Sequence, residues 1–163
     1  MKSIEIDGGS TAPATGAGTE RFFIPGIGRL CESLSPYSYD LMRFALGAIL
    51  VPHGVNKLFF GDVVNASHTM EKLGLAPPFA WAYLIGVLEF AGGLMLALGL
   101  YTRLVALAVF VEMLVISFGV LWPKWWWGGR GMEYALLMAV LALAIFFRGG
   151  GAYSLDRRLT RTF

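Results

Sequence analysis

Four stretches of mainly apolar residues dominate the chain, and each is about as long as a membrane span. They cover residues 41–60, 79–100, 104–123 and 131–147. A helix needs roughly 20 apolar residues to cross the hydrocarbon core of a bilayer. Backbone groups in lipid find no water to bond, so each stretch must form a helix. The pattern therefore predicts an all-α integral membrane protein, a bundle of four transmembrane helices.

Residues 1–37 precede the first stretch and differ from it in composition. The first part of this segment contains acids and small residues, without the apolar run of a signal peptide. We therefore predict a flexible N-terminal tail. Scattered apolar positions in residues 21–37, interrupted by Pro25 and Pro36, favour a segment that lies on the membrane surface.

The connections between the stretches carry their own signals. Residues 61–78 predict a short interfacial helix that ends before Gly74. The tryptophan-rich stretch 122–127 suits the headgroup boundary, because indole rings are apolar and carry one N–H donor. The turn 100–103 is so short that the second and third helices must be antiparallel neighbours. Residues 148–163 predict a basic cytoplasmic tail.

The distribution of basic residues predicts the orientation of the bundle. Outside the spans, the side that holds both termini carries Lys2, Arg21, Arg29, Arg103, Arg148, Arg157, Arg158 and Arg161. The other side carries Lys72, Lys124 and Arg130. Cytoplasmic loops of membrane proteins are enriched in Lys and Arg. We therefore expect a multi-pass protein with both termini in the cytoplasm.

Composition supports the membrane class and excludes several functions. Hydrophobic residues make up 56% of the 163 positions, against 13 basic and 11 acidic residues. The single cysteine, Cys31, excludes dithiol chemistry within the chain. Two histidines, His53 and His68, are too few for an obvious metal cage, so no metal site is predicted. The basic residues form no single patch in the sequence, which argues against nucleic acid as a partner.

Glycines recur at a seven-residue spacing on two of the predicted helices. Gly47 and Gly54 lie on the first helix, and Gly86 and Gly93 on the second, with Gly92 beside them. Helices in lipid associate through close packing at small residues. Lipid tails are as apolar as the helices, so the hydrophobic effect does not drive the helices together. These positions predict that the first two helices pack together. A general preference for small residues is the alternative.

Six ionisable residues in the spans form the candidate charge network: Arg43, His53, Lys57, Glu89, Glu112 and Glu133. Such residues are costly in lipid and usually face the bundle interior. A rise of about 1.5 Å per residue puts Glu89 and Glu112 near the midplane. Side chains also lean toward the N-terminus of their helix. The pairs matched by depth and direction are Arg43–Glu112, His53–Glu89 and Lys57–Glu133, with crossed pairings left open.

Simpler explanations exist for some of these charges. Arg43 and Lys57 could extend to the nearer headgroups. Glu133 could be an ordinary carboxylate at a helix start, favoured by the helix dipole. Glu89 and Glu112 lie too deep for that and must be ion-paired or protonated. The candidates for a catalytic role are Glu89, His53 and Glu112.

Beyond these patterns, four segments resemble the DoxX family: RFALGAILVPHGVNKLFF, GLAPPFAWAYLIGVLEFAGGLMLALGLYTR, GGRGMEYALL and GAYSLDRRL. The resemblance covers about residues 38–158, a DoxX-like domain. Its motif positions are Arg43, His53, Gly54, Lys57, Glu89, Gly92, Gly93, Thr102, Arg103, Gly131 and Glu133. The resemblance implies a four-helix protein of the bacterial inner membrane. Many relatives carry a histidine near the position of Leu121, which puts in doubt here any mechanism that needs that imidazole.

What the family implies about function is less uniform than its fold. Its founding members resemble the membrane subunit of a thiosulfate:quinone oxidoreductase, and others are linked to thiol and oxidative-stress redox complexes. The chain has no dithiol, haem motif or nucleotide fingerprint, so it is at most an oxidoreductase subunit. No cofactor is expected within the chain itself, and a quinone is the candidate ligand. Electrons would come from a partner protein.

Two other functions stay open at this stage. The chain could be a non-catalytic accessory or anchor subunit whose charges set the helix register. It could also be a small transporter, which about 120 residues in the bilayer could form only as a homo-oligomer. Membrane lipid is an expected partner in every case.

Overall fold

The computed structural model describes residues 23–159, and all regular structure in that range is helical, as predicted. Predictions that fall on residues 1–22 and 160–163 lie outside it. The elements are α1 (Pro25–Phe59), α2 (Val63–Lys72), α3 (Pro78–Val87), η1 (Leu88–Gly92), α4 (Gly93–Leu98), α5 (Thr102–Val115), η2 (Ile116–Leu121), η3 (Trp127–Gly129), α6 (Glu133–Arg148) and η4 (Leu155–Arg158). The segments η1 and η2 are π-helical, whereas η3 and η4 are short 3₁₀ turns.

The first helix begins earlier than the apolar pattern predicts. α1 is 35 residues long and contains both Pro36 and Pro52. Pro36 was expected to interrupt a surface segment, yet the helix continues through it. A proline removes one helical N–H bond, and the bonds of the turns on either side preserve the helix.

Two helical segments are long and apolar enough to cross a membrane. They are Pro78–Leu98, formed by α3, η1 and α4, and Thr102–Leu121, formed by α5 and η2. The pair α1 and α2 meets the same requirement only when taken together across a bend of 97°. α6 has 16 residues, fewer than the roughly 20 that a span needs. The described residues thus hold two or three candidate spans.

Glycines in left-handed conformation end two of the helices. Gly74 follows α2 with a φ of +74°, and Gly99 follows α4 with a φ of +70°. The backbone N–H groups after each helix return to its last carbonyls, with Leu75 bonding Met70 and Leu100 bonding Met95. The predicted short helix that ends before Gly74 is therefore confirmed. Pro78 occupies the first turn of α3, where its missing N–H costs nothing.

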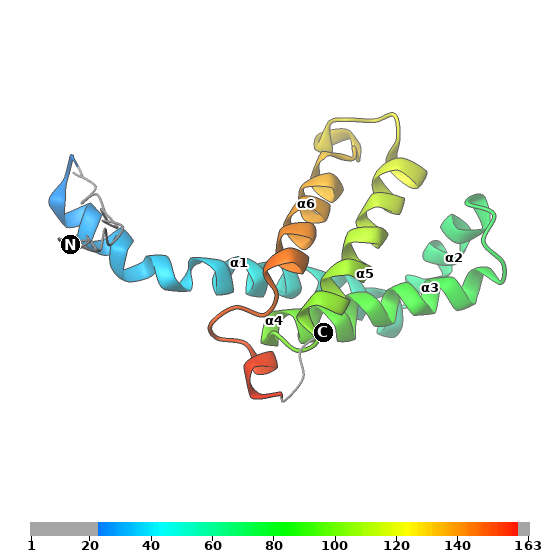
Figure 1. The fold of residues 1–163 in the computed structure, drawn as a ribbon. Helices are drawn as coiled ribbons and strands as arrows, with labels where there is room; N and C mark the ends of the chain where they lie inside the picture. The colour runs from blue at the N-terminus through cyan, green and yellow to red at the C-terminus, as the bar shows by residue number, and fades with distance from the viewer. Residues whose placement is uncertain (1–22, 160–163) are drawn as a thin grey trace, which may run out of the picture. The chain divides into compact units, whose positions relative to one another are not determined.

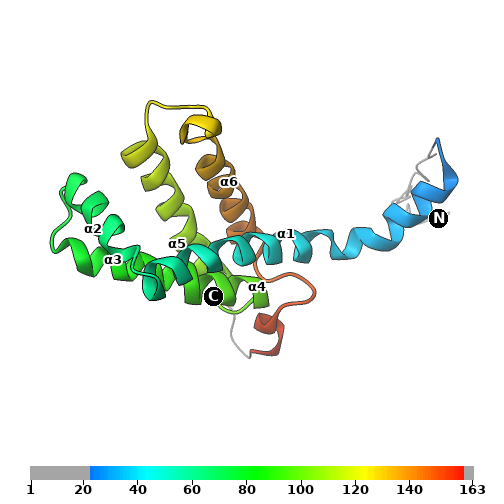
Figure 2. The same cartoon turned by 180° about the vertical axis from the view of Figure 1, so that it is seen from behind.

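From Leu34 onward the chain forms one compact unit built on two helix pairs. α1 runs alongside the α3–η1–α4 segment, and α5 runs alongside α6 (Figures 1 and 2). The first pair is antiparallel, because Gly47 lies against Ala97 whereas Gly54 lies against Phe90.

Glycine spacing brings the backbones of the first pair into contact. A Cβ added at Gly54 would lie 2.3 Å from the Phe90 nitrogen, and one at Gly47 would lie 2.4 Å from the Gly93 oxygen. Gly86 faces Leu58 of α1. Gly92 points elsewhere, toward Val105 of α5. Four of the five glycines thus mark the contact between α1 and the second segment.

The interior and the surface are both apolar. Small and branched side chains fill the contact between α5 and α6: Ala106, Val109, Ala135, Ala139, Ala142 and Ile145 are buried. Large apolar residues on the same helices are exposed, among them Leu104, Val111, Leu137 and Val140. An apolar exterior of this extent suits contact with lipid, not water.

Candidate functional site

A buried ion pair connects the two neighbouring helices α1 and η1. The Lys57 ammonium nitrogen lies 2.8 Å from Oε1 and 2.6 Å from Oε2 of Glu89. The Lys57 side chain is 16% exposed and that of Glu89 only 4%. Of the three N–H bonds of the ammonium group, two are engaged by the carboxylate.

The local backbone explains why these two charges meet. Glu89 is the second residue of the π-helical segment η1, and π-segments inside helices occur frequently at functional sites. The contact between Gly54 and Phe90 sets the two backbones close together at this level. Lys57 lies one turn beyond Gly54, and its long side chain leans back toward the helix N-terminus. It therefore reaches Glu89.

This pairing differs from the sequence-based one. Depth and direction matched Glu89 with His53 and Lys57 with Glu133, whereas Glu89 and Lys57 bind each other. The depth of a Cα atom does not fix the depth of a lysine ammonium group, because the side chain is long enough to reach another level of the bundle. Glu133 is the first residue of α6, as expected for a carboxylate at a helix start.

The ion pair lies on the wall of a cavity of about 540 Å³. The polar groups on this wall come from α1, η1, the loop before α6 and the first turn of α6, and they include His53 and Tyr134. The remaining wall is mostly apolar: Leu50, Met113, Ile116, Leu121, Ala135 and Met138. Leu121, the position where many relatives are expected to carry a histidine, thus contributes an apolar side chain to this cavity.

The loop between η2 and α6 closes one end of the same cavity. Arg130 and Gly131 line it. The backbone N–H of Met132 bonds the Lys124 carbonyl at 2.8 Å, which folds the loop back on itself. A Cβ at Gly131 would lie 2.3 Å from the Trp125 carbonyl carbon, so only glycine fits this turn.

A second cavity of about 400 Å³ shares Lys57 and Glu89 with the first. It extends between α2, α3 and α5, and Glu112 lines it. Glu112 is buried, and neither of its carboxylate oxygens has a hydrogen-bond partner. Its carboxyl group interacts electrostatically with Glu89 and Lys57. Four of the six candidate charges, His53, Lys57, Glu89 and Glu112, therefore gather around the two cavities.

Arg43 belongs to a different cluster, at the end of α4. Its guanidinium Nη1 donates to the carbonyls of Leu96 at 2.6 Å and Ala97 at 2.8 Å. Its Nη2 donates to Asp40 Oδ1 at 3.1 Å and to the Tyr153 carbonyl at 3.2 Å. The expected pairing with Glu112 is therefore wrong. The last carbonyls of a helix lack partners and carry negative charge, so they attract a cation.

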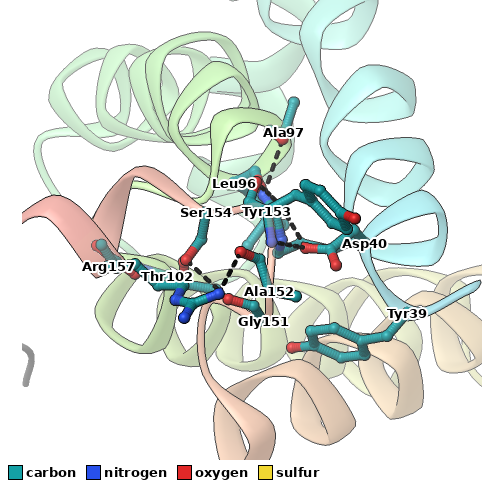
Figure 3. Close-up of polar contacts among 12 residues, drawn as sticks. Tyr39, Asp40, Leu96, Ala97, Thr102, Gly151, Ala152, Tyr153, Ser154 and Arg157 are labelled. Carbon is teal, nitrogen blue, oxygen red and sulfur yellow. Dashed lines mark hydrogen bonds and ion pairs between the residues drawn. The ribbon is translucent and has the colours of Figure 1, made fainter. Parts of the chain in front are cut away.

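The C-terminal segment folds back onto this cluster instead of extending away from it. Tyr153 donates its backbone N–H to Asp40, and Ser154 bonds the Gly151 carbonyl (Figure 3). Asp156 accepts the N–H groups of Tyr101 at 2.7 Å and Thr102 at 2.9 Å, which caps the start of α5. The motif GAYSLDRRL thus closes the turn between α4 and α5.

Sequence reasoning missed Asp40 and Asp156 as structural partners. Asp40 stands three residues before Arg43 on the same helix, a spacing at which side chains meet, so this pair was open to detection. Asp156 binds backbone groups 54 and 55 residues away, and nothing local indicates that contact.

The arrangement offers proton-transfer groups beside apolar space and no evident metal site. Within residues 23–159, no three His, Cys, Asp or Glu side chains gather closely enough to hold a metal ion. The first cavity combines an ammonium–carboxylate pair, an imidazole and a phenol with apolar walls. Such a site suits an apolar ligand that carries a few hydrogen-bonding oxygens.

Comparisons with known proteins give a family and two relatives. The family model described as DoxX matches residues 39–122, which include Arg43, His53, Lys57, Glu89 and Glu112. An uncharacterized membrane protein of Mycobacterium tuberculosis is 27% identical over 148 residues, covering 84% of this chain and 90% of its own length. An uncharacterized protein of Haemophilus influenzae is 29% identical over 135 residues, covering 78% of this chain and 94% of its own length. No solved structure matches the chain significantly.

Proposed function

This chain belongs to the DoxX family of membrane proteins, and we propose that it is a redox-linked membrane subunit that binds a quinone beside a partner protein. The observation that carries this proposal is the cavity of about 540 Å³ with the Lys57–Glu89 pair in its wall. Ligand sites are mostly apolar clefts of about 300–1,000 Å³ with a few well-placed polar groups.

The residues of the cavity fit a quinone by chemistry as well as by size. A quinone presents two carbonyl oxygens at the ends of a flat apolar ring and takes up electrons and protons when it is bound and reduced. Leu50, Met113 and Met138 supply apolar contacts for a ring. The remaining N–H of the Lys57 ammonium and the Tyr134 hydroxyl can each donate to a carbonyl oxygen.

The ion pair and the imidazole would manage protons. Lys57 holds a proton at Nζ between the cavity and Glu89, and the Glu89 carboxylate can accept that proton over 2.6 Å. His53 lines the same cavity, and a neutral imidazole carries one donor and one acceptor nitrogen, so it can pass a proton between a bound ligand and the cavity wall. Electrons would be supplied by the partner, because the single Cys31 provides no dithiol.

Orientation in the membrane follows from the basic residues. We propose four spans, of which α1 forms the first and α6 the last. The protein would lie in the inner membrane of a bacterium, with both termini in the cytoplasm. Eight Lys and Arg residues outside the spans lie on the side of the termini, against three on the other. Local thinning of the bilayer would accommodate the 16 residues of α6.

A second candidate function is a non-catalytic accessory subunit. The observation that favours it is the geometry of the ion pair, in which both oxygens of Glu89 bind Lys57 and hold α1 to η1. Buried ion pairs of this kind can have a purely structural role, in which they fix the register of neighbouring helices.

Quinone retention separates the two functions. The protein, purified in mild detergent from its native membrane, should retain quinone that solvent extraction and mass spectrometry quantify. Ala135→Phe places a ring in the larger cavity, so it should lower the retained quinone and the affinity for added decylubiquinone at least about tenfold.

Ala108→Phe is the matched control, because Ala108 lines the second cavity only. It should leave quinone retention unchanged. If the wild-type protein carries no quinone and does not bind decylubiquinone, while it still purifies with an intact partner complex, the accessory function replaces the proposal.

A further inference from the structure

We propose that the chain binds the headgroup of an anionic phospholipid in a basic cavity between the start of α5 and the segment that follows α6. This site lies apart from the Lys57–Glu89 pair and shares no lining residue with it. The proposal does not depend on the quinone function.

Three arginines from three elements surround this cavity. Arg103 comes from the first turn of α5, Arg148 from the last residue of α6 and Arg157 from η4, and the enclosed volume is about 170 Å³. A water molecule takes up about 30 Å³ in the liquid, so a phosphate group fits the space. Guanidinium groups bind phosphate oxygens through pairs of parallel hydrogen bonds.

The charge of the cavity is positive. Asp156 also lines it, but both of its oxygens already accept the N–H groups of Tyr101 and Thr102 at the start of α5. Three cations and one carboxylate line the cavity, so its net charge is positive. This excess attracts an anion.

Glycines keep the cavity open. Gly149 and Gly151 have φ values of +82° and +80°, which side-chain-bearing residues rarely adopt. A Cβ at Gly149 would lie 3.2 Å from Arg103 Nε. Tyr39 donates its hydroxyl to the Gly149 carbonyl, and the guanidinium carbon of Arg148 lies 4.3 Å from the centre of the Tyr39 ring. The position of Arg148 at the cavity is thus held by packing.

An apolar groove adjoins the basic cavity and decides between a lipid and a free phosphate. Arg103, Leu104, Leu107 and Phe146 line this groove of about 350 Å³ between α5 and α6. Arg103 belongs to both spaces. Leu104 is 61% and Leu107 39% exposed, so the groove opens on the lipid-facing surface. A ligand with an anionic head and an apolar chain fills both spaces, whereas a free phosphate fills one.

Native mass spectrometry of the full chain in mild detergent tests the site. Phosphatidylglycerol should be retained at least about tenfold more strongly than phosphatidylcholine with the same acyl chains. Arg157→Gln should reduce this preference severalfold, and Arg103→Gln combined with Arg157→Gln should abolish it. Arg158→Gln is the matched control, because the neighbouring Arg158 is exposed and does not line the cavity.

Two further measurements identify the ligand and exclude unfolding. Leu107→Trp should weaken phosphatidylglycerol binding by filling the groove, whereas Leu94→Trp, with a similar exposure of 42% against 39%, should not. The melting temperature of Arg157→Gln should equal that of the wild type in lipid-free detergent. Equal retention of the two lipids, a full preference in Arg157→Gln with Arg103→Gln, or displacement of phosphatidylglycerol by millimolar inorganic phosphate would each overturn the proposal.

Discussion

Buried charged residues of this chain lie in three different environments. Lys57 and Glu89 satisfy each other across two helices. Arg43 is satisfied mainly by backbone carbonyls at the end of α4. Glu112 is buried beside Lys57 and Glu89 without a hydrogen bond of its own. A buried glutamate thus has different surroundings at positions 89 and 112, so substitutions at the two positions should change stability by different amounts.

Glu89→Gln should destabilise the protein by removing the counterion of Lys57. Breaking a buried ion pair from one side costs about 3–5 kcal/mol, because the remaining charge stays desolvated. The free energy of unfolding, measured by SDS titration in mixed micelles, should fall by about 3 kcal/mol. Adding Lys57→Met should recover at least half of that loss.

Glu71→Gln on α2 is the control, because Glu71 is exposed. It should change stability by less than about 0.5 kcal/mol. A double variant no more stable than Glu89→Gln alone would mean that the ammonium group is not what destabilises the single variant.

Glu112→Gln should behave differently from Glu89→Gln. Neither carboxylate oxygen of Glu112 has a hydrogen-bond partner, so the amide gives up no hydrogen bond. It also removes an acid from beside Glu89. We expect a change below about 1 kcal/mol in the same SDS titration. A loss as large as that of Glu89→Gln would show that Glu112 has an essential partner.

At the scale of elements, close backbone approach at glycine sets the register of α1 against the second segment. Gly54 lies against Phe90, and Gly47 against Gly93 and Ala97. This register brings Lys57 to the level of Glu89. The ion pair is therefore a consequence of glycine packing as well as a stabilising contact.

Gly54→Ala should test this register with a single methyl group. The new Cβ would lie 2.3 Å from the Phe90 nitrogen and 2.7 Å from its Cα, closer than van der Waals contact allows. Overpacking of this kind costs about 1–3 kcal/mol, and the melting temperature in detergent should fall accordingly.

Gly26→Ala is the matched control on the same helix. No atom lies within 4 Å of the position of its Cβ, so stability should stay the same or rise slightly. If Gly54→Ala and Gly26→Ala have the same melting temperature, the backbones at Gly54 and Phe90 are further apart than described.

At the scale of the whole molecule, the proposed orientation in the membrane rests on the distribution of basic residues. Cys31 is exposed near the start of α1. The proposed orientation places it in the cytoplasm, with the termini. A membrane-impermeant maleimide should leave Cys31 unlabelled in intact cells and label it after permeabilisation.

The opposite side is tested by Glu71→Cys in a Cys31→Ser background. Glu71 is exposed on α2, which joins the first two predicted spans, so intact cells should be labelled there. Labelling of Cys31 in intact cells, with Glu71→Cys protected, would invert the proposed orientation.

The sequence by itself determined the class of the protein and most of its helices. Runs of apolar residues are a local property, and backbone groups in lipid have one general solution, the helix. The helix before Gly74 was predictable for the same reason, because a left-handed glycine ends a helix locally. The family resemblance also came from the sequence, as the match over residues 39–122 bears out.

Only the tertiary structure decided which charges meet. Helix depth predicted Arg43 with Glu112 and His53 with Glu89, but pairing depends on the rotation and register of whole helices. Those are set by contacts such as Gly54 with Phe90, which no single segment encodes. The fold-back of Asp156 onto α5 is likewise a long-range contact. The cavities arise from the same cause, because their walls combine side chains from helices far apart in sequence.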